Sequence, residues 1–176
     1  ACRSPNPWIL AGLGCGAAGD VFLIRAERSG LFLAGLAAFL LGHLSYLVAF
    51  VGPVLRSGPD SPWVFAAAFP LAAYGVLIYR RLRPGLGSMK LPVALYTAVI
   101  LGMALAALLR VSLTTGLPFW LPLCGALCFI ASDTLLAWRR FRGPIRSGRT
   151  LVALTYIAAQ SLIVLGYLLA GGLRTG

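Results

Sequence analysis

The sequence predicts an all-α protein, a polytopic bundle of six transmembrane helices that forms one domain over residues 1–176. Three observations carry this prediction. Hydrophobic residues make up 60% of the chain and charged residues 11%, with a mean hydropathy of +0.91, so polar side chains are too few to coat a soluble globule. The apolar residues are gathered into long blocks. Short, arginine-rich connections separate these blocks.

Each apolar block is close to the ~17 to 25 residues that cross a bilayer as a helix. The first carries Asp20 and has no basic leader with a cleavage site behind it, so we expect a helix and no signal peptide. Because the connections are short, consecutive helices should be antiparallel neighbours. The blocks are Trp8–Ile24, Leu31–Leu55, Trp63–Tyr79, Leu91–Leu109, Pro118–Trp138 and Leu151–Ala170.

The distribution of Lys and Arg predicts the orientation. The first, third and fifth connections hold 11 of the 15 basic residues. The other four are Arg3, Arg56, Arg110 and Arg174, one each in the N-terminal segment, the second and fourth connections and the C-terminal segment. By the positive-inside rule, the odd connections should face the cytoplasm and both ends of this chain should face away from it.

The net charge of +11 does not indicate nucleic-acid binding, because the arginines lie between apolar blocks and form no basic face with interleaved aromatics. The cysteines do not indicate a zinc site. Cys124 and Cys128 share a helix face, but no His, Asp or Glu lies within one turn of them.

Two aspartates stand inside apolar blocks: Asp20 in GLGCGAAGDVFLI and Asp133 in FIASDTLLAWRRF. An ionised carboxylate near the bilayer centre costs at least ~2.5 kcal/mol, so each is a functional-site hypothesis. Each lies about five residues before the cytoplasmic end of its block, which places both in one layer roughly 5 to 8 Å from the midplane. The alternative interpretation is a structural polar contact that holds two helices together.

Further polar residues fall near this layer. Tyr96 and Tyr156 share it, whereas His43 and Gln160 lie close to the midplane. His43 and the neighbouring Tyr46 could equally be ordinary packing residues of a bundle.

The glycines of the first block, GCGAAG, match the letters of a dinucleotide-binding loop, but that motif requires a strand before it and a helix after it. Here Gly12 and Gly16 form a GxxxG pair inside a membrane helix. We therefore expect close helix packing around Asp20.

Five stretches, in this order, resemble the YhhN family of membrane lysoplasmalogenases. They are GDVFLI, FLLGHLSYLVAF, LPVALYTAVILGM, GALCFIASDTLLAWRRF and LTYIAAQSLIVLG, and together they span Gly19 to Gly166. The family form typically has eight helices, so the resemblance implies a chain that is short by two N-terminal helices. It also implies that Asp20 and Asp133 are the catalytic pair. The positions that match the family's other polar residues are His43, Tyr46, Tyr96, Ser132, Tyr156 and Gln160.

The activity implied by the resemblance is hydrolysis of the vinyl ether bond of lysoplasmalogens. The products are a fatty aldehyde and glycerophosphoethanolamine or glycerophosphocholine, and no metal or organic cofactor is required. Such hydrolysis protonates the β-carbon and passes through an oxocarbenium ion, as glycoside hydrolysis does between two carboxyl groups. Two aspartates in one low-dielectric site favour one protonated and one ionised group, and Ser132 beside Asp133 is a candidate donor to the pair.

The expected partners are a lysophospholipid substrate and the bilayer. Arg139, Arg140 and Lys90 are candidates for the substrate phosphate, because arginine forks suit phosphate oxygens. The resemblance of GLAAFLLGHLSYLVAF to bacterial members favours a bacterial inner membrane, with the endoplasmic reticulum as the alternative. A proton-coupled transporter or channel would also use intramembrane carboxylates, although the chain shows no internal repeat of the kind many transporters have. A purely structural subunit is the third possibility.

Overall fold

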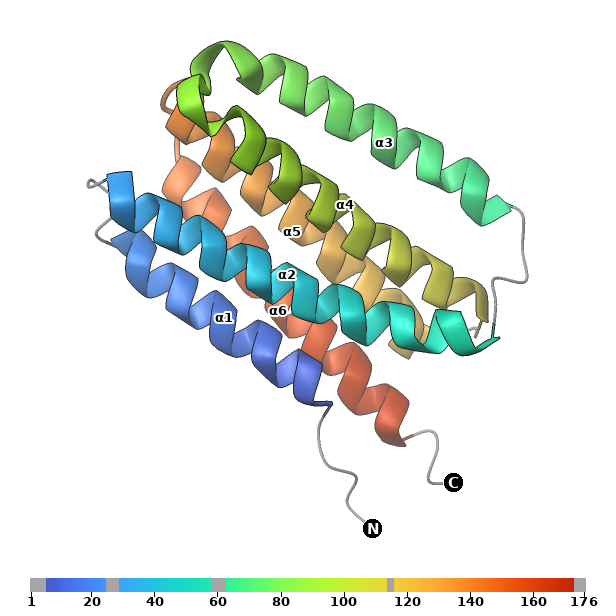
Figure 1. The fold of residues 1–176 in the computed structure, drawn as a ribbon. Helices are drawn as coiled ribbons and strands as arrows, with labels where there is room; N and C mark the ends of the chain where they lie inside the picture. The colour runs from blue at the N-terminus through green and yellow to red at the C-terminus, as the bar shows by residue number, and fades with distance from the viewer. Residues whose placement is uncertain (1–5, 25–28, 58–62, 114–115, 173–176) are drawn as a thin grey trace.

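In a computed structural model of the chain, residues 6–24, 29–57, 63–113 and 116–172 are described, and they form a bundle of six helices (Figure 1). The predicted fold class is thereby confirmed. The helices are α1 (Pro7–Ile24), α2 (Ser29–Ser57), α3 (Trp63–Leu82), α4 (Lys90–Leu113), α5 (Leu117–Phe141) and α6 (Gly148–Gly172). Two short 3-10 turns, η1 (Arg83–Gly85) and η2 (Gly87–Met89), join α3 to α4.

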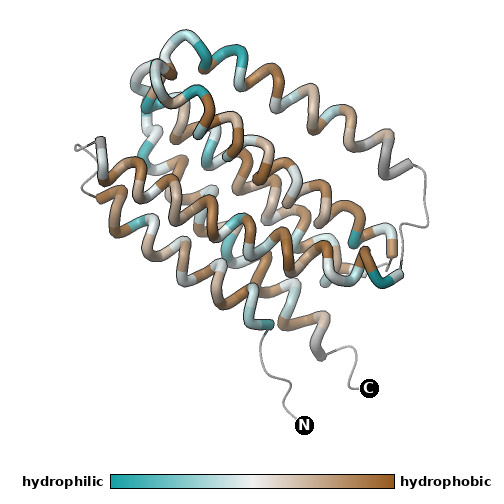
Figure 2. The backbone as a smooth tube through the Cα atoms, viewed as in Figure 1, coloured by the Kyte–Doolittle hydropathy of each residue, from teal (hydrophilic) through white to brown (hydrophobic). Residues whose placement is uncertain are grey.

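Five of the helices, α1, α2, α4, α5 and α6, are long and apolar enough within the described residues to cross a membrane. The chain is therefore an integral, multi-pass membrane protein. The crossing by α3 stays a prediction. Figure 2 shows hydrophobic residues along the helices, with hydrophilic ones concentrated where α3, α4, α5 and α6 meet at one end of the bundle.

Consecutive helices are neighbours as expected, with one exception: α2 packs on α4 rather than on α3. α1 pairs with α2, α5 pairs with α6, and α4 lies between α2 and α5. α3 packs on α4 from the outside and touches α5. α1 begins and α6 ends at the same end of the bundle (Figure 1).

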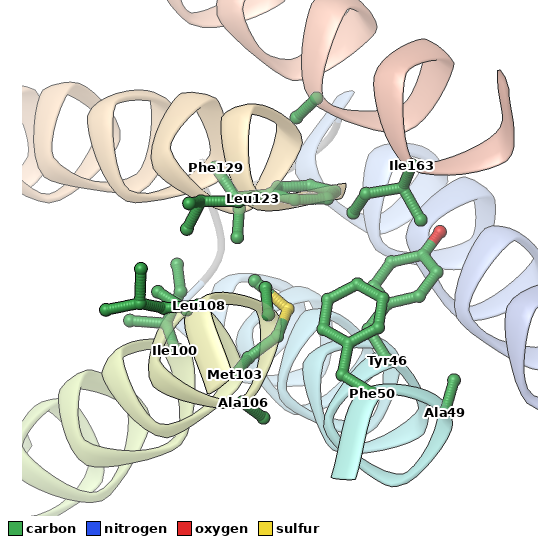
Figure 3. Packing of buried hydrophobic residues seen from close by; sticks show 14 of the residues in the cluster. Tyr46, Ala49, Phe50, Ile100, Met103, Ala106, Leu108, Leu123, Phe129 and Ile163 are labelled. Carbon is green, nitrogen blue, oxygen red and sulfur yellow. The ribbon is translucent and has the colours of Figure 1, made fainter. Parts of the chain in front are cut away.

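The core lies where α2, α4, α5 and α6 meet (Figure 3). Phe50, Met103, Ala126 and Ile163 are fully buried there. Glycine permits close approach of α5 and α6, because a Cβ on Gly125 of α5 would lie 2.8 Å from the carbonyl oxygen of Ala159 in α6. In contrast, many large apolar side chains point outward, as expected of helices that face lipid.

Most helices extend a few residues beyond the approximate predicted blocks. The consequence is largest in α4, which continues to Leu113, so that Arg110 lies inside the helix rather than in the predicted connection. Its side chain is buried, with the guanidinium carbon 4.3 Å from the ring centre of Tyr167 and 5.4 Å from that of Phe119. Aromatic faces accommodate a planar guanidinium inside the bundle. Hydropathy alone treats an arginine as the end of an apolar block. Arg3 and Arg174 lie outside the described residues.

Candidate active site within the membrane bundle

The Asp133 carboxyl group of α5 is held by α4 and α2. The Tyr96 hydroxyl donates a 2.6 Å hydrogen bond to Oδ2 of Asp133, and Nε2 of His43 lies 3.7 Å from the same oxygen. Among the described residues, Oδ1 of Asp133 makes no hydrogen bond. One carboxyl oxygen is therefore fixed and the other is available.

His43 is buried between two aromatic rings. Its imidazole packs edge to face on Tyr96 and Phe129, with ring centres 5.4 and 4.9 Å away. Neither ring nitrogen makes a hydrogen bond of good geometry with the described residues, although the backbone of Phe39, one turn earlier, interacts with the ring. Buried polar groups are nearly always satisfied, so the two ring nitrogens of His43 are an exception within the described part of the bundle.

Asp20 belongs to a second polar cluster, built from α1, α6 and α2. The Tyr156 hydroxyl lies within hydrogen-bonding reach of the Asp20 carboxyl group. Nε2 of Gln160 donates to the Tyr156 hydroxyl oxygen at 3.1 Å, and the Tyr46 hydroxyl donates to Oε1 of Gln160. These contacts form a chain from Tyr46 through Gln160 and Tyr156 to Asp20.

Tyr156 connects the two clusters electrostatically, because its hydroxyl is in range of both Asp20 and Asp133. Aromatic rings fill the space around it. Phe129 and Phe39 each pack edge to face on Tyr156 with ring centres 5.8 Å away, and Tyr46 stacks with Phe50 (Figure 3).

The GxxxG pair of α1 makes room for the second cluster, in agreement with the packing expected from the sequence. A Cβ on Gly16 would lie 2.5 Å from Nε2 of Gln160 and 2.6 Å from the Tyr156 hydroxyl. A Cβ on Gly12 would lie 2.5 Å from the Tyr46 ring. Both glycines are buried.

A pocket of about 70 Å³ reaches Asp133. It lies among α2, α3, α4 and α5, and its wall is apolar apart from Asp133 and the hydroxyl groups of Tyr96, Thr97, Tyr74 and Thr134. Tyr74 and Thr134 hydrogen-bond each other at 2.8 Å and so tie α3 to α5. Of the two aspartates, Asp133 lines this pocket and Asp20 does not. Sequence reasoning missed both threonines and Tyr74, since hydroxyls are common in membrane helices.

The remaining predicted residues lie apart from the carboxyl groups. The Ser132 hydroxyl donates to the carbonyl oxygen of Val152 at 3.2 Å, where it joins α5 to α6. Consecutive helix residues point about 100° apart, so Ser132 and Asp133 face different neighbours. Lys90 and Arg140 are exposed and Arg139 is half-buried, near the cytoplasmic end predicted for the bundle. The guanidinium of Arg140 lies over the Phe32 ring at 4.6 Å.

Within the described residues, no three His, Cys, Asp or Glu side chains cluster as metal ligands would. The fold and the site together define a polytopic membrane protein with a carboxyl group at the wall of an apolar pocket.

Residues 1–167 match the model of the YhhN family, and the chain belongs to this family. It is 38% identical to the pig lysoplasmalogenase TMEM86B over 86% of this chain and 59% of that protein. It is 35% identical to the rat lysoplasmalogenase TMEM86B over 96% of this chain and 65% of that protein. It is 30% identical to a lysoplasmalogenase of Mycobacterium tuberculosis over 91% of this chain and 60% of that protein. The chain thus spans about three fifths of the length of these relatives. No solved structure shows a significant match.

Proposed function

We propose that this protein is a hydrolase of the lysoplasmalogenase type, which cleaves the vinyl ether bond of lysoplasmenylethanolamine or lysoplasmenylcholine. One observation carries the proposal: an apolar pocket inside a membrane bundle contains the carboxyl group of Asp133, with one oxygen fixed and one available. Curated relatives named lysoplasmalogenases support the same activity.

Asp133 is the proton donor in this mechanism. With Oδ2 accepting from Tyr96, the proton on Oδ1 passes to the β-carbon of the vinyl ether and the C=C electron pair forms the new C–H bond. The α-carbon becomes an oxocarbenium ion. Water adds to that carbon, loses a proton to the Asp133 carboxylate and gives a hemiacetal, which collapses to the aldehyde and the glycerol hydroxyl. General acid catalysis contributes about 10² to 10⁴ in rate.

Asp20 takes a less direct role in this proposal. It does not line the pocket, and its contact with the site runs through Tyr156. Because Tyr156 is in electrostatic range of both carboxyl groups, an ionised Asp20 orients the Tyr156 hydroxyl and adds negative charge near the developing oxocarbenium ion.

Among the three basic residues that the sequence suggests, Arg140 is the one that contacts a residue of the pocket wall. Its guanidinium lies over Phe32, and Phe32 lines the pocket. Arg139 and Lys90 are near the same end of the bundle and would contribute through charge rather than through a defined contact.

The decisive experiment measures fatty aldehyde release from a lysoplasmalogen by the purified, reconstituted protein. Asp133→Asn keeps the shape of the side chain and removes the proton, so we expect release to fall by about 10² or more. Glu27→Gln is the control, because the sequence predicts that this carboxyl group lies in a connection, outside the layer of the two aspartates. An Asp133→Asn protein with more than about a tenth of the original rate, a smaller loss than a general acid allows, would contradict this role.

The same reconstituted protein tests the alternative of a proton-coupled transporter or channel. Aldehyde release without proton flux across the liposome membrane supports the hydrolase. Proton flux without aldehyde release would contradict the proposed hydrolase activity and support the transporter or channel.

A further inference from the structure

The pocket at Asp133 is too small for the whole substrate. A water molecule needs about 10 to 15 Å³ on the same measure, so 70 Å³ holds roughly five to seven water-sized groups. The hydrocarbon chain of a lysophospholipid has many more carbon groups than that. The vinyl ether can therefore enter this pocket only if the hydrocarbon chain lies somewhere else.

A larger space lies directly beside the pocket. A groove of about 450 Å³ runs between α3 and α4 on the outer side of the bundle. Its apolar surface includes small exposed residues, Ala72 of α3 and Ala98 of α4, together with Val76. Small side chains leave room there for a hydrocarbon chain.

The groove and the pocket share three residues: Gly75, Thr97 and Leu101. The absence of a side chain at Gly75 is what lets Leu101 pack there, because a Cβ at this position would clash with the Leu101 side chain. The wall that the two spaces share thus includes a half-buried leucine side chain packed on a glycine, beside Thr97. Rotation of Leu101 would connect them.

The charges in the groove suit a phosphate. Arg80 and Arg83 line its end nearest the basic connection, and no acidic residue lines it. Both arginines are exposed, and no ion pair joins either of them to another described residue. Arginine recognises phosphate oxygens through paired hydrogen bonds.

The spacing along α3 also fits a lysophospholipid. Arg80 and Gly75 are five residues apart on α3, a rise of about 7.5 Å. In a lysoplasmalogen, six bonds of about 1.5 Å separate the phosphorus atom from the first vinyl carbon, roughly 7 to 8 Å when extended. A phosphate held at the level of Arg80 therefore leaves the vinyl ether near the level of Gly75 on the helix axis, with the hydrocarbon chain directed toward Ala72.

We propose that the α3–α4 groove binds the single-chain phospholipid substrate, with its phosphate at Arg80 and Arg83, before the vinyl ether passes Leu101 to reach Asp133. The inference rests on the proposed function for the identity of the lipid. It assigns the phosphate to different arginines from those that the sequence favours.

The test uses a lipid that the enzyme cannot cleave, so that binding is separate from hydrolysis. The probe is a lysophosphatidylcholine with a saturated sn-1 alkyl ether and a photoreactive diazirine in its chain. After irradiation of the reconstituted protein, peptide mass spectrometry should place the label on α3 and α4 at the groove. Label confined to other lipid-facing helices would overturn the proposal.

Two pairs of variants sharpen the result. Ala98→Trp fills the groove without lining the pocket and should reduce labelling about tenfold, whereas Ala153→Trp on the exposed face of α6 should not. Arg80→Gln with Arg83→Gln should reduce labelling about tenfold and raise KM with kcat little changed, as loss of a charged hydrogen bond predicts. Arg142→Gln with Arg146→Gln is the matched control. Equal labelling of either test variant and its control would refute the site.

The remaining outcomes are also decisive. A two-chain anionic phospholipid that displaces the probe better than lysophosphatidylcholine would show a resident lipid in the groove and overturn the substrate assignment. Groove labelling in a protein that releases no aldehyde would contradict the proposed function and support a groove that binds lysolipids. Aldehyde release without groove labelling would support the proposed function and contradict the groove as the substrate site.

Discussion

Tyr96 is the side chain that fixes the geometry of Asp133, through the 2.6 Å hydrogen bond to Oδ2. Tyr96→Phe removes only that hydroxyl. Asp133 becomes charged as it gives up its proton, and hydrogen bonds to charged groups contribute about 1.5 to 3 kcal/mol. We therefore expect kcat to fall about 10- to 150-fold, as 1.4 kcal/mol corresponds to a factor of ten. Tyr74→Phe also removes a pocket hydroxyl but leaves Asp133 untouched, and it should keep most of the activity. Steady-state kinetics of aldehyde release would check both, and equal losses in the two variants would contradict the role of Tyr96.

Asp20 and Tyr156 should behave as one unit, because the contact of Asp20 with the site runs through the Tyr156 hydroxyl. Asp20→Asn and Tyr156→Phe should each strongly reduce aldehyde release, and the double variant should be little worse than either. Tyr167→Phe is a control, since that hydroxyl donates to the carbonyl of Ala49 in the core. Additive losses in the double variant would show that Asp20 acts independently of Tyr156.

The sequence predicted the depth of these residues in the membrane but not all of their contacts. Counting residues from the helix ends placed Tyr96 at the level of Asp133, and the two are hydrogen-bonded. That counting gives depth along a helix and not rotation about its axis. The placement of Ser132 against Val152, and the separation of Asp20 from the pocket, both depend on rotation. Apolar residues on every face of a membrane helix leave rotation poorly determined.

At the scale of the helix, α1 depends on glycine where it meets α6. A methyl group at Gly16 would fall 2.5 Å from Nε2 of Gln160 and 2.6 Å from the Tyr156 hydroxyl, both ends of movable side chains. Gly16→Ala should therefore displace the hydrogen-bond chain to Asp20 and reduce aldehyde release more than it reduces stability. Gly14 has open space around it. Gly14→Ala should retain full activity and add about 0.5 to 1 kcal/mol of helix stability.

Thermal unfolding in detergent and aldehyde release, measured on the same preparations, would separate the two effects. If Gly16→Ala is as active as Gly14→Ala, the packing of α1 on α6 does not control the site.

The number of helices was predicted correctly, whereas their ends were predicted less well, and the difference has a physical reason. Six long apolar blocks can form little else in a bilayer, because backbone groups in lipid must be satisfied within the helix. Helix ends depend on single residues. Arg110 ended the fourth predicted block, yet α4 passes through it because Tyr167 and Phe119 receive its guanidinium. Those two partners come from other helices and were not visible from the local sequence.

For the molecule as a whole, the basic residues are distributed unevenly between the two ends of the bundle. The connections from α3 to α4 and from α5 to α6 lie at one end of the bundle. The basic residues in these connections and in the adjoining helix ends are Arg80, Arg81, Arg83 and Lys90 at the first and Arg139, Arg140, Arg142, Arg146 and Arg149 at the second. Arg56 lies in the last turn of α2, at the opposite end of the bundle, where α1 begins and α6 ends. Arg110 lies in the last turn of α4, where its side chain is buried against aromatic rings.

We predict that the Arg80–Lys90 and Arg139–Arg149 connections face the cytoplasm, because loops rich in Lys and Arg are retained there. The measurement is labelling of intact cells with a membrane-impermeant maleimide, in a background with the four native cysteines replaced by alanine. Arg142→Cys, which is exposed, should react only after the cells are permeabilised, whereas Arg56→Cys, exposed at the opposite end, should react in intact cells. The reverse pattern would place the groove and its arginines at the outer leaflet, and the substrate would then have to enter from that side.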